Sequence, residues 1–295
     1  MRRRAKSFAL AGAFLPASKR RSLEALYAVF RVADDLADEP GLSERERREG
    51  LLSIARDFES VRDPSYDSRA IWFLAVRSAF LHYPIAIEDA LGVVAACSDE
   101  LAGVHPRSIE DLERHAASLS GGVARCGVAV IGSADEQALA LAQRVGIAMQ
   151  LTNILRDAER DRAGGRDYFA FANRNDIGLA ANTFKHEIAR RAHAHFAAGV
   201  ELAASLPRDG SDVAILLAVE LHRALLERME RGGFVAHGPR VRLGAIEMLG
   251  CALRAKIASF RQARRVPGPS PRSARTPHRR SPRNPESSFP ESSRP

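Results

Sequence analysis

The sequence QLTNILRDAERDRAGGRDYF, residues 150–169, is the stretch from which the rest of the chain is best interpreted. Four polar residues in it repeat at intervals of three, four and four: Gln150, Asn153, Asp157 and Asp161. On a helix this spacing places them within a sector of about 80°. The other positions from 141 to 155 are largely apolar, which is typical of a buried helix. Because an unpaired buried carboxylate is costly, the acidic stripe indicates a positively charged partner inside the protein.

A solvated helix edge is the alternative interpretation of the same residues. Arg156, Arg160 and Arg162 lie among the acids and could pair with them at the protein surface. The choice between a surface edge and an interior site therefore depends on whether a second acidic element faces the first.

A second acidic stretch, LEALYAVFRVADDLADE at residues 23–39, favours the interior site. Its apolar residues recur at helical spacing, and on a helical wheel Asp34 falls inside the apolar arc. Asp38 follows one turn later and Arg31 flanks it, whereas Asp35 points well away. Two helices that each direct Asp-x-x-x-Asp inward can form an oxygen cage for Mg²⁺, which takes few carboxylates together with water and substrate phosphate oxygens. The residues therefore predict a Mg²⁺–diphosphate site within a helical protein.

The bulk composition gives little support to a nucleic-acid-binding protein and favours a reducing compartment. The chain has 295 residues, with 44 Lys and Arg against 36 Asp and Glu, but residues 262–295 alone hold eight Arg and two Glu. The high net charge is therefore mostly a property of the C-terminal end. Cys97, Cys126 and Cys251 show no C-x-x-C spacing, which argues against a disulfide framework or a zinc site and fits the cytoplasm.

The N-terminal residues imitate a secretory signal, because basic residues precede a short apolar run. That run is only about eight residues long, and Lys19, Arg20 and Arg21 follow soon after it, so we expect no cleaved signal. No stretch approaches the ~18 uninterrupted apolar residues of a membrane span. The expected location is the cytoplasm, with peripheral contact at the inner face of a membrane left open.

Helical patterns dominate the chain and strand patterns are nearly absent. We predict helices over residues 7–14, 18–38, 43–61, 67–81, 85–103, 108–121, 123–131, 135–162, 176–206, 211–231 and 240–261. Ser43 with Glu46 predicts a capping box. The predicted fold is a single all-α domain, residues 1–262, with its helices packed around a deep apolar cavity. Residues 263–295, rich in Pro, Arg and Ser, are predicted to form a disordered tail.

Three stretches in order along the chain resemble the squalene/phytoene synthase family, the head-to-head prenyl diphosphate synthases. AKSFALAGAFLP, residues 5–16, is similar to the family's opening S-K-S-F and short helix. ALYAVFRVADDLADE, residues 25–39, resembles its first aspartate motif, and VGIAMQLTNILRDAERDRAGGRDYF, residues 145–169, resembles its second. The resemblance spans residues 4–260 and implies the isoprenoid-synthase type of helical bundle.

The resemblance implies roles for individual residues. The expected Mg²⁺ ligands are Asp34, Asp38, Asn153, Asp157 and Asp161. The residues expected to contact diphosphate oxygens are Lys6, Ser7, Phe8, Arg31, Arg156 and Arg166. Tyr27 and Gln150 would face the reacting prenyl chains. The four aspartates and Tyr27 are thus the expected catalytic residues, and Mg²⁺ is the expected cofactor.

Several positions depart from the family's pattern. His115 stands where the R-Y-x-x-x-V-A-G signature has tyrosine, and Ser120-Gly121 replaces its Ala-Gly. His222 takes the place of a tyrosine in the C-terminal pattern, and Ala170 replaces a proline after Arg-x-Tyr. These departures keep open a non-catalytic relative that acts as an assembly or lipid-binding protein.

The resemblance implies Mg²⁺-dependent condensation of two prenyl diphosphates through a cyclopropyl diphosphate intermediate. Cations and arginines neutralise the leaving diphosphate in such chemistry, and apolar walls keep water from the carbocation. Phytoene from two geranylgeranyl diphosphates is the expected product, and squalene or presqualene diphosphate from farnesyl diphosphate is the alternative. The expected partners are the prenyl diphosphates, with peripheral membrane contact for release of a lipid product. Nucleic-acid binding is not expected, although the Arg-rich tail leaves it open as a third hypothesis.

Overall fold

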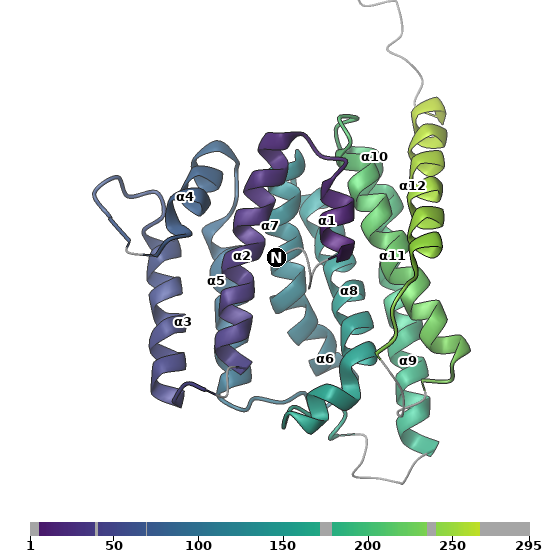
Figure 1. Cartoon of the computed structure of the whole chain (residues 1–295), viewed down its shortest axis with the longest axis horizontal. Helices are drawn as coiled ribbons and strands as arrows, with labels where there is room; N and C mark the ends of the chain where they lie inside the picture. The colour runs from purple at the N-terminus through teal and green to yellow at the C-terminus, as the bar shows by residue number, and fades with distance from the viewer. Residues whose placement is uncertain (1–5, 39–40, 69, 172–178, 235–239, 266–295) are drawn as a thin grey trace, which may run out of the picture.

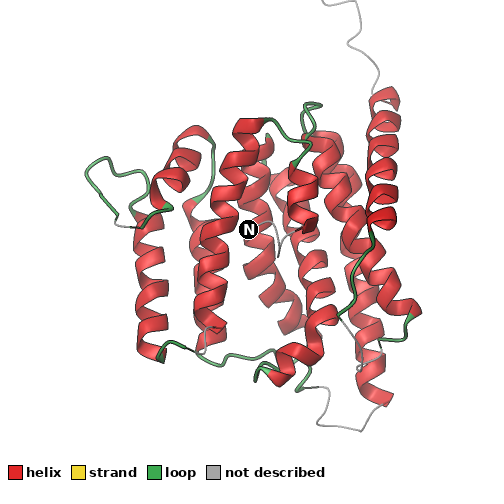
Figure 2. Ribbon diagram, in the orientation of Figure 1, coloured by secondary structure: helices red, strands yellow, loops and turns green. Residues whose placement is uncertain are grey.

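Every regular element that the computed structural model describes is a helix, as Figures 1 and 2 show. The described residues are 6–38, 41–68, 70–171, 179–234 and 240–265. Their elements are α1 (Lys6–Gly12), α2 (Ala17–Asp38), α3 (Glu44–Glu59), α4 (Phe73–His82), α5 (Ile87–Leu101), α6 (Ile109–Ala116), the π-helix η1 (Ala117–Gly121), α7 (Gly122–Ile131), α8 (Glu136–Ala163), α9 (Leu179–Phe196), α10 (Ala198–Ser205), α11 (Ser211–Arg231) and α12 (Ala245–Arg265). The predicted all-α fold is confirmed.

The helix that was predicted from residue 67 begins later than expected. α4 starts only at Phe73, and the described residues before it, 61–68 and 70–72, form a loop. Arg77 holds this loop by donating hydrogen bonds to the carbonyl oxygens of Asp63, at 2.8 Å, and Tyr66, at 3.2 Å. A side chain on the helix therefore stabilises an irregular segment whose own apolar spacing looked helical.

Further boundaries differ from the prediction, and the helix predicted from residue 240 begins only at Ala245. The helix predicted over residues 176–206 is divided at Ala197 into α9 and α10, two residues before Gly199. α12 continues to Arg265, so residues 263–265, which were assigned to the tail, are helical. The predicted disorder of the rest of the tail concerns residues 266–295, which lie outside the described residues.

α8 begins with a side-chain cap and then passes very close to η1. The carboxylate of Asp135 accepts a hydrogen bond from the backbone N–H of Ala138 at 2.9 Å, which satisfies a free donor of the first turn. Gly146 is the point of closest approach, because a Cβ added there would collide with the backbone carbonyl of Ser120. Gln150, one turn further on, is thereby placed beside the π-helix.

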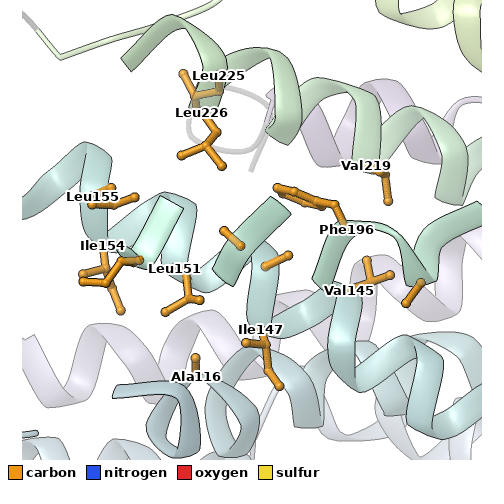
Figure 3. Packing of buried hydrophobic residues seen from close by; sticks show 14 of the residues in the cluster. Ala116, Val145, Ile147, Leu151, Ile154, Leu155, Phe196, Val219, Leu225 and Leu226 are labelled. Atoms are coloured by element: carbon orange, nitrogen blue, oxygen red, sulfur yellow. The ribbon is translucent and has the colours of Figure 1, made fainter. Parts of the chain in front are cut away.

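Two large apolar clusters fill the interior, and α7 contributes to both. The first cluster packs α8 against α9, α10 and α11, and Figure 3 shows Leu151 of α8 and Leu226 of α11 within it. The second lies among α2, α3, α4 and α5 around the fully buried Phe58. α7 supplies Val128 to the first cluster and Cys126 to the second. α2 and α8 therefore contribute their buried residues to different halves of the core, and α7 contributes to both.

The ends of α2 and α8 that carry the acidic motifs lie toward the same end of the molecule (Figure 1). The loop that follows α5 runs past this end as well. Cys97, Cys126 and Cys251 are buried free thiols. None of the described helices is long and apolar enough to cross a membrane. The central cavity that was predicted with the fold stays a prediction.

Candidate active site

Asp157 lies on the buried side of α8 and is held by two arginines. Arg240 donates to both of its carboxylate oxygens, from Nε at 2.6 Å and from Nη2 at 2.7 Å, and Arg156 of the same helix also contacts both. Burial alone would raise the pKa of Asp157, but the hydrogen bonds and charges of these arginines outweigh it and lower the pKa to about 2. Asp157 is therefore ionised at any physiological pH.

Arg240 is a site residue that the sequence analysis missed. It precedes α12 and is 83 positions away from Asp157 in the chain. Helical spacing connects only residues within a few turns of each other, and no motif in the sequence includes Arg240. Only the packed fold brings its guanidinium to the second aspartate motif.

Arg31 joins two neighbouring aspartates of the first motif on α2. Its Nη1 donates to Asp34 at 2.6 Å and its Nη2 donates to Asp35 at 2.6 Å. The side chain of Asp34 is 26% exposed and that of Asp35 is 46% exposed, so Asp34 is the more enclosed of the two. The arginine thus fixes the direction of Asp34 from its solvent side.

Other predicted residues of the site have side chains outside the described part of the structure. Asp38 is the last residue of α2, and Lys6, Ser7 and Phe8 form the first turn of α1. Their backbones are helical. Their expected roles as a Mg²⁺ ligand and as diphosphate contacts stay predictions.

Glu100, near the end of α5, is a buried acid at the centre of a polar cluster. Its Oε1 accepts a hydrogen bond from the hydroxyl of Tyr168 at 2.7 Å, and its Oε2 accepts one from Arg166 at 3.2 Å. His115 Nε2 lies 2.9 Å from Oε1 but without hydrogen-bond geometry. The Glu100 side chain is only 5% exposed. Arg166, a predicted diphosphate contact, is therefore held by protein groups, and its role toward diphosphate stays a prediction.

The charge of Glu100 acts on both aspartate motifs. Burial raises the pKa of Asp34, Arg31 opposes the shift, and the nearby Glu100 adds to it. Burial likewise raises the pKa of Asp161, with Arg160 acting against it and Glu100 adding to it. α2 and α8 therefore present carboxylates to a common region beside Glu100. The positive charge in that region does not fully offset the free-energy cost of burying the charged carboxylates of Asp34 and Asp161.

Two predicted contacts of the prenyl chains lie next to these groups. Ser120 Oγ of η1 donates to Gln150 Oε1 at 2.6 Å, so the amide of Gln150 has a fixed partner. Tyr27 precedes Arg31 by one turn, and burial raises the pKa of its hydroxyl. Asn153 is partly buried on the same helix as Gln150. These side chains belong to α2 and α8, the helices that carry the aspartates, and their contact with substrate stays a prediction.

Both unusual histidines are packed inside the protein. The ring of His115 lies against Tyr168, with centroids 5.8 Å apart. His222 donates from Nδ1 to the carbonyl oxygen of Ala218 at 2.8 Å. Burial lowers the pKa of His222 to about 4, and the charge of Arg156 acts in the same direction. His222 is therefore neutral at pH 7 and does not supply positive charge to a diphosphate there.

The donor set fits a divalent cation in part. Asp34 and Asp161 are carboxylates crowded by other acids, which is a situation that a cation would relieve. Both oxygens of Asp157 contact arginines, so this residue would bind a cation only by sharing its remaining lone pairs. Within the described residues, no group of three or more His, Cys, Asp and Glu is arranged to hold a metal ion, and the side chain of Asp38 is not among them.

An all-α protein whose aspartates and arginines from two helices meet at one end is suited to an anionic, oxygen-rich substrate. The family model described as squalene/phytoene synthase matches residues 1–247. The chain belongs to the squalene/phytoene synthase family, which confirms the resemblance seen in the sequence motifs. It is an enzyme of the prenyltransferase type, and the reaction of its family is the head-to-head condensation of prenyl diphosphates.

The regions of sequence similarity to known synthases cover more than half of the chain. A presqualene diphosphate synthase from Zymomonas mobilis is 27% identical over 274 residues, which cover 87% of this chain and 91% of that protein. A phytoene synthase from Mycobacterium tuberculosis is 28% identical over 175 residues, which cover 59% of this chain and 56% of that protein. A crystal structure of a dehydrosqualene synthase has the same fold, with a TM-score of 0.77, 22% identity and coverage of 89% of this chain and 94% of the other.

Proposed function

We propose that this enzyme condenses two molecules of farnesyl diphosphate to presqualene diphosphate. The convergence of the acids and arginines of α2 and α8 beside Glu100 is the observation that supports a condensation site. The choice of substrate rests on the similarity to the Zymomonas mobilis presqualene diphosphate synthase, which extends over 91% of that protein. The similarity to the phytoene synthase extends over only 56% of its length.

The proposed reaction breaks the bond between C1 and the diphosphate oxygen of one substrate. The double bond of the second substrate forms new carbon–carbon bonds to that C1, and one proton is lost as the cyclopropane ring closes. One diphosphate is released, and the other is retained on the product. No reductant is consumed in this step.

The arginines that contact the aspartates of the two motifs would stabilise the leaving diphosphate. Arg31, Arg156 and Arg240 are already oriented by Asp34, Asp35 and Asp157, so little reorganisation is needed when charge develops on the leaving group. Mg²⁺, held by Asp34 and Asp161 together with Asp38, would supply further positive charge when bound.

The apolar surroundings would protect the carbocation that remains. Tyr27 and Gln150 lie on the helices that carry the aspartates, and the buried residues beside them belong to the two apolar clusters. A site with such walls excludes water, which would otherwise capture the cation. Ser120 holds the amide of Gln150 and so keeps this polar group in one position.

Phytoene formation from geranylgeranyl diphosphate is the second candidate function. It was the first expectation from the sequence, and the phytoene synthase of Mycobacterium tuberculosis is 28% identical over the matched 175 residues. The two candidates share the aspartates and arginines of the site, and they differ in the length of the prenyl chain that the interior must accept.

A product assay distinguishes these functions. The purified enzyme is incubated with Mg²⁺ and radiolabelled farnesyl or geranylgeranyl diphosphate, without a reductant, and the products are separated with and without phosphatase treatment. We expect presqualene diphosphate from farnesyl diphosphate, a value of kcat/KM at least about tenfold higher than with geranylgeranyl diphosphate, and loss of turnover with a chelator. A preference for geranylgeranyl diphosphate would assign phytoene formation. No condensation with either substrate would indicate a non-catalytic relative.

A further inference from the structure

α12 exposes a continuous apolar face at the edge of the molecule. Five large apolar side chains on it are between 42% and 87% exposed: Ile246, Leu249, Leu253, Ile257 and Phe260. Their spacing places them within a sector of about 80° on the helix. Cys251 and Ala255, on the opposite side, are fully buried against α11. Figure 1 shows α12 as the outermost helix beside α11. A single exposed leucine needs no explanation, but a helical stripe of five marks an interaction surface.

A hydrogen bond on the buried side of α12 joins this helix to α10. Val200 of α10 is 52% exposed. The side-chain amide of Gln262 on α12 donates to the carbonyl oxygen of Val200 at 2.8 Å, so the two helices are joined there. The bond fixes α12 against α10 and so helps to hold the exposed face in one orientation.

Positive charge accompanies this apolar face. α12 carries five Lys and Arg, of which Arg254 pairs with Glu220 of α11, and a single acidic residue, Glu247, which pairs with Arg228. Arg264 lies over the ring of Phe260, with its guanidinium carbon 4.5 Å from the ring centroid. The 30 residues that follow the helix, 266–295, add six Arg and two Glu to the same end of the chain. The surface is thus apolar along one face and cationic at its flank and end.

We propose that α12 is a docking surface for an anionic phospholipid membrane, with its axis in the plane of the interface. An apolar stripe flanked by Lys and Arg can bury its side chains at the acyl boundary while its cations contact lipid phosphates. A second copy of the chain fits less well, because pairing two such faces would bring two sets of arginines together. The inference does not depend on which prenyl diphosphate reacts.

Vesicle co-sedimentation tests this surface directly, without substrate. The full chain is mixed with vesicles of phosphatidylcholine alone or with a third of phosphatidylglycerol, at low and at high salt. We expect binding to the anionic vesicles that weakens as salt rises. Leu253→Glu and Phe260→Glu should each reduce the bound fraction, expressed as a partition coefficient, by at least about tenfold. Circular dichroism and turnover in detergent micelles should stay at the wild-type level.

α4 offers a matched control for apolar exposure. Ile71, in the loop before α4, and Leu74, in its first turn, are 98% and 73% exposed, and both are far from α12 in the chain. Ile71→Glu and Leu74→Glu should leave vesicle binding unchanged. Arg261→Gln with Arg264→Gln should lower binding to anionic vesicles at low salt, and deletion of residues 266–295 should lower it less than Leu253→Glu does.

Three outcomes would overturn the proposal. The wild-type chain could fail to bind anionic vesicles at low salt, or the α4 variants could reduce binding as much as the α12 variants. The third outcome is a dimer in sedimentation velocity that Leu253→Glu dissociates, which would show that a second copy covers the face. The product assay of the proposed function is independent of all three, so the two proposals can fail separately.

Discussion

At the scale of single residues, the guanidinium of Arg31 fixes the positions of two carboxylates of the first motif. One guanidinium binds Asp34 and Asp35 at the same time, each at 2.6 Å. A lysine ammonium at this position would be a single point charge and could not hold both carboxylates in fixed directions. The orientation of Asp34 toward the site therefore depends on a residue one turn earlier in the same helix.

Because Arg31 binds both aspartates, substitution of Arg31 should reduce turnover more than substitution of Asp35. Arg31→Lys should lower kcat/KM with farnesyl diphosphate by at least about tenfold, because both orientation and contact with diphosphate are lost. Asp35→Asn should cost only a few-fold, because Asp34 still holds Arg31. Steady-state kinetics with Mg²⁺ measure both variants. A larger loss for Asp35→Asn than for Arg31→Lys would show that Asp35 has a role of its own.

Glu100 is predicted to stabilise the polar cluster at the end of α5. Glu100→Gln removes the charge that pairs with Arg166, at 3.2 Å, in a place where the side chain is 5% exposed. The free energy of unfolding should fall by about 1–3 kcal/mol, since a buried charged partner is left with a weaker acceptor. Urea denaturation measures this change. Glu49→Gln on the exposed face of α3 is the control, with an expected change within about 0.5 kcal/mol. An equal effect of the two variants would exclude a structural role for Glu100.

Because His222 is buried, the folded protein is expected to lose stability in mild acid. Its pKa is lowered from 6.5 in the unfolded chain to about 4 in the folded protein, so protons bind preferentially to the unfolded state between these values. Stability should therefore be complete above pH 6.5 and fall by about 3 kcal/mol on acidification to pH 4. His222→Leu should flatten this slope in urea titrations at several pH values. His105→Leu, in an exposed loop, should leave it unchanged, and a slope equal to wild type in His222→Leu would contradict the assignment.

The sequence predicts those site residues that share a helix, and misses those that only the packed fold brings together. Asp34, with its enclosed side chain, and Asp157, which is buried, were both expected from 3.6-residue periodicity, because that spacing is a local property of the backbone. Glu100 and Arg240 were not, since their partners Tyr168 and Asp157 are 68 and 83 positions away. An acid near a helix end and an arginine in a connecting segment look like ordinary surface residues in a single sequence.

At the scale of the helices, the contact of α8 with η1 positions Gln150. Gly146 allows the two backbones to touch, and Ser120 then reaches the Gln150 amide at 2.6 Å. The sequence indicated a helix on both sides of this contact, but it did not indicate that residues 117–121 form a π-helix. π-Turns inserted between α-helices are frequently found at functional sites, where they redirect side chains. The start of α3, by contrast, follows from its cap, because Ser43 and Glu46 form the predicted capping box.

Two glycine substitutions test this helix contact against helix propensity. Gly146→Ala should destabilise the protein by about 2–4 kcal/mol, because its Cβ would collide with the Ser120 carbonyl. Gly92→Ala in α5 has no atom within 4 Å of the added Cβ and should stabilise the protein by about 0.5–1 kcal/mol. Thermal unfolding of both variants measures these changes in stability. A stabilised Gly146→Ala variant would show that α8 and η1 are further apart than described.

At the scale of the whole molecule, the polar site and the exposed apolar face belong to different elements. The aspartate motifs are on α2 and α8, inside the two halves of the core, and the apolar face is on α12 at the edge. The all-α fold follows from helical periodicity, because each predicted helix has an apolar side to bury. How the halves meet at α7 could not be predicted, since α7 is a short apolar helix that packs on both sides.

The most direct test of the account is product formation from farnesyl diphosphate by the wild-type enzyme and by two variants. Asp34→Asn on α2 and Asp157→Asn on α8 each remove one carboxylate from the shared region, and circular dichroism checks that the helices are retained. The account predicts presqualene diphosphate from the wild type with Mg²⁺, and at least about a hundredfold less from each variant. Wild-type turnover by either variant would contradict the claim that α2 and α8 form one catalytic site.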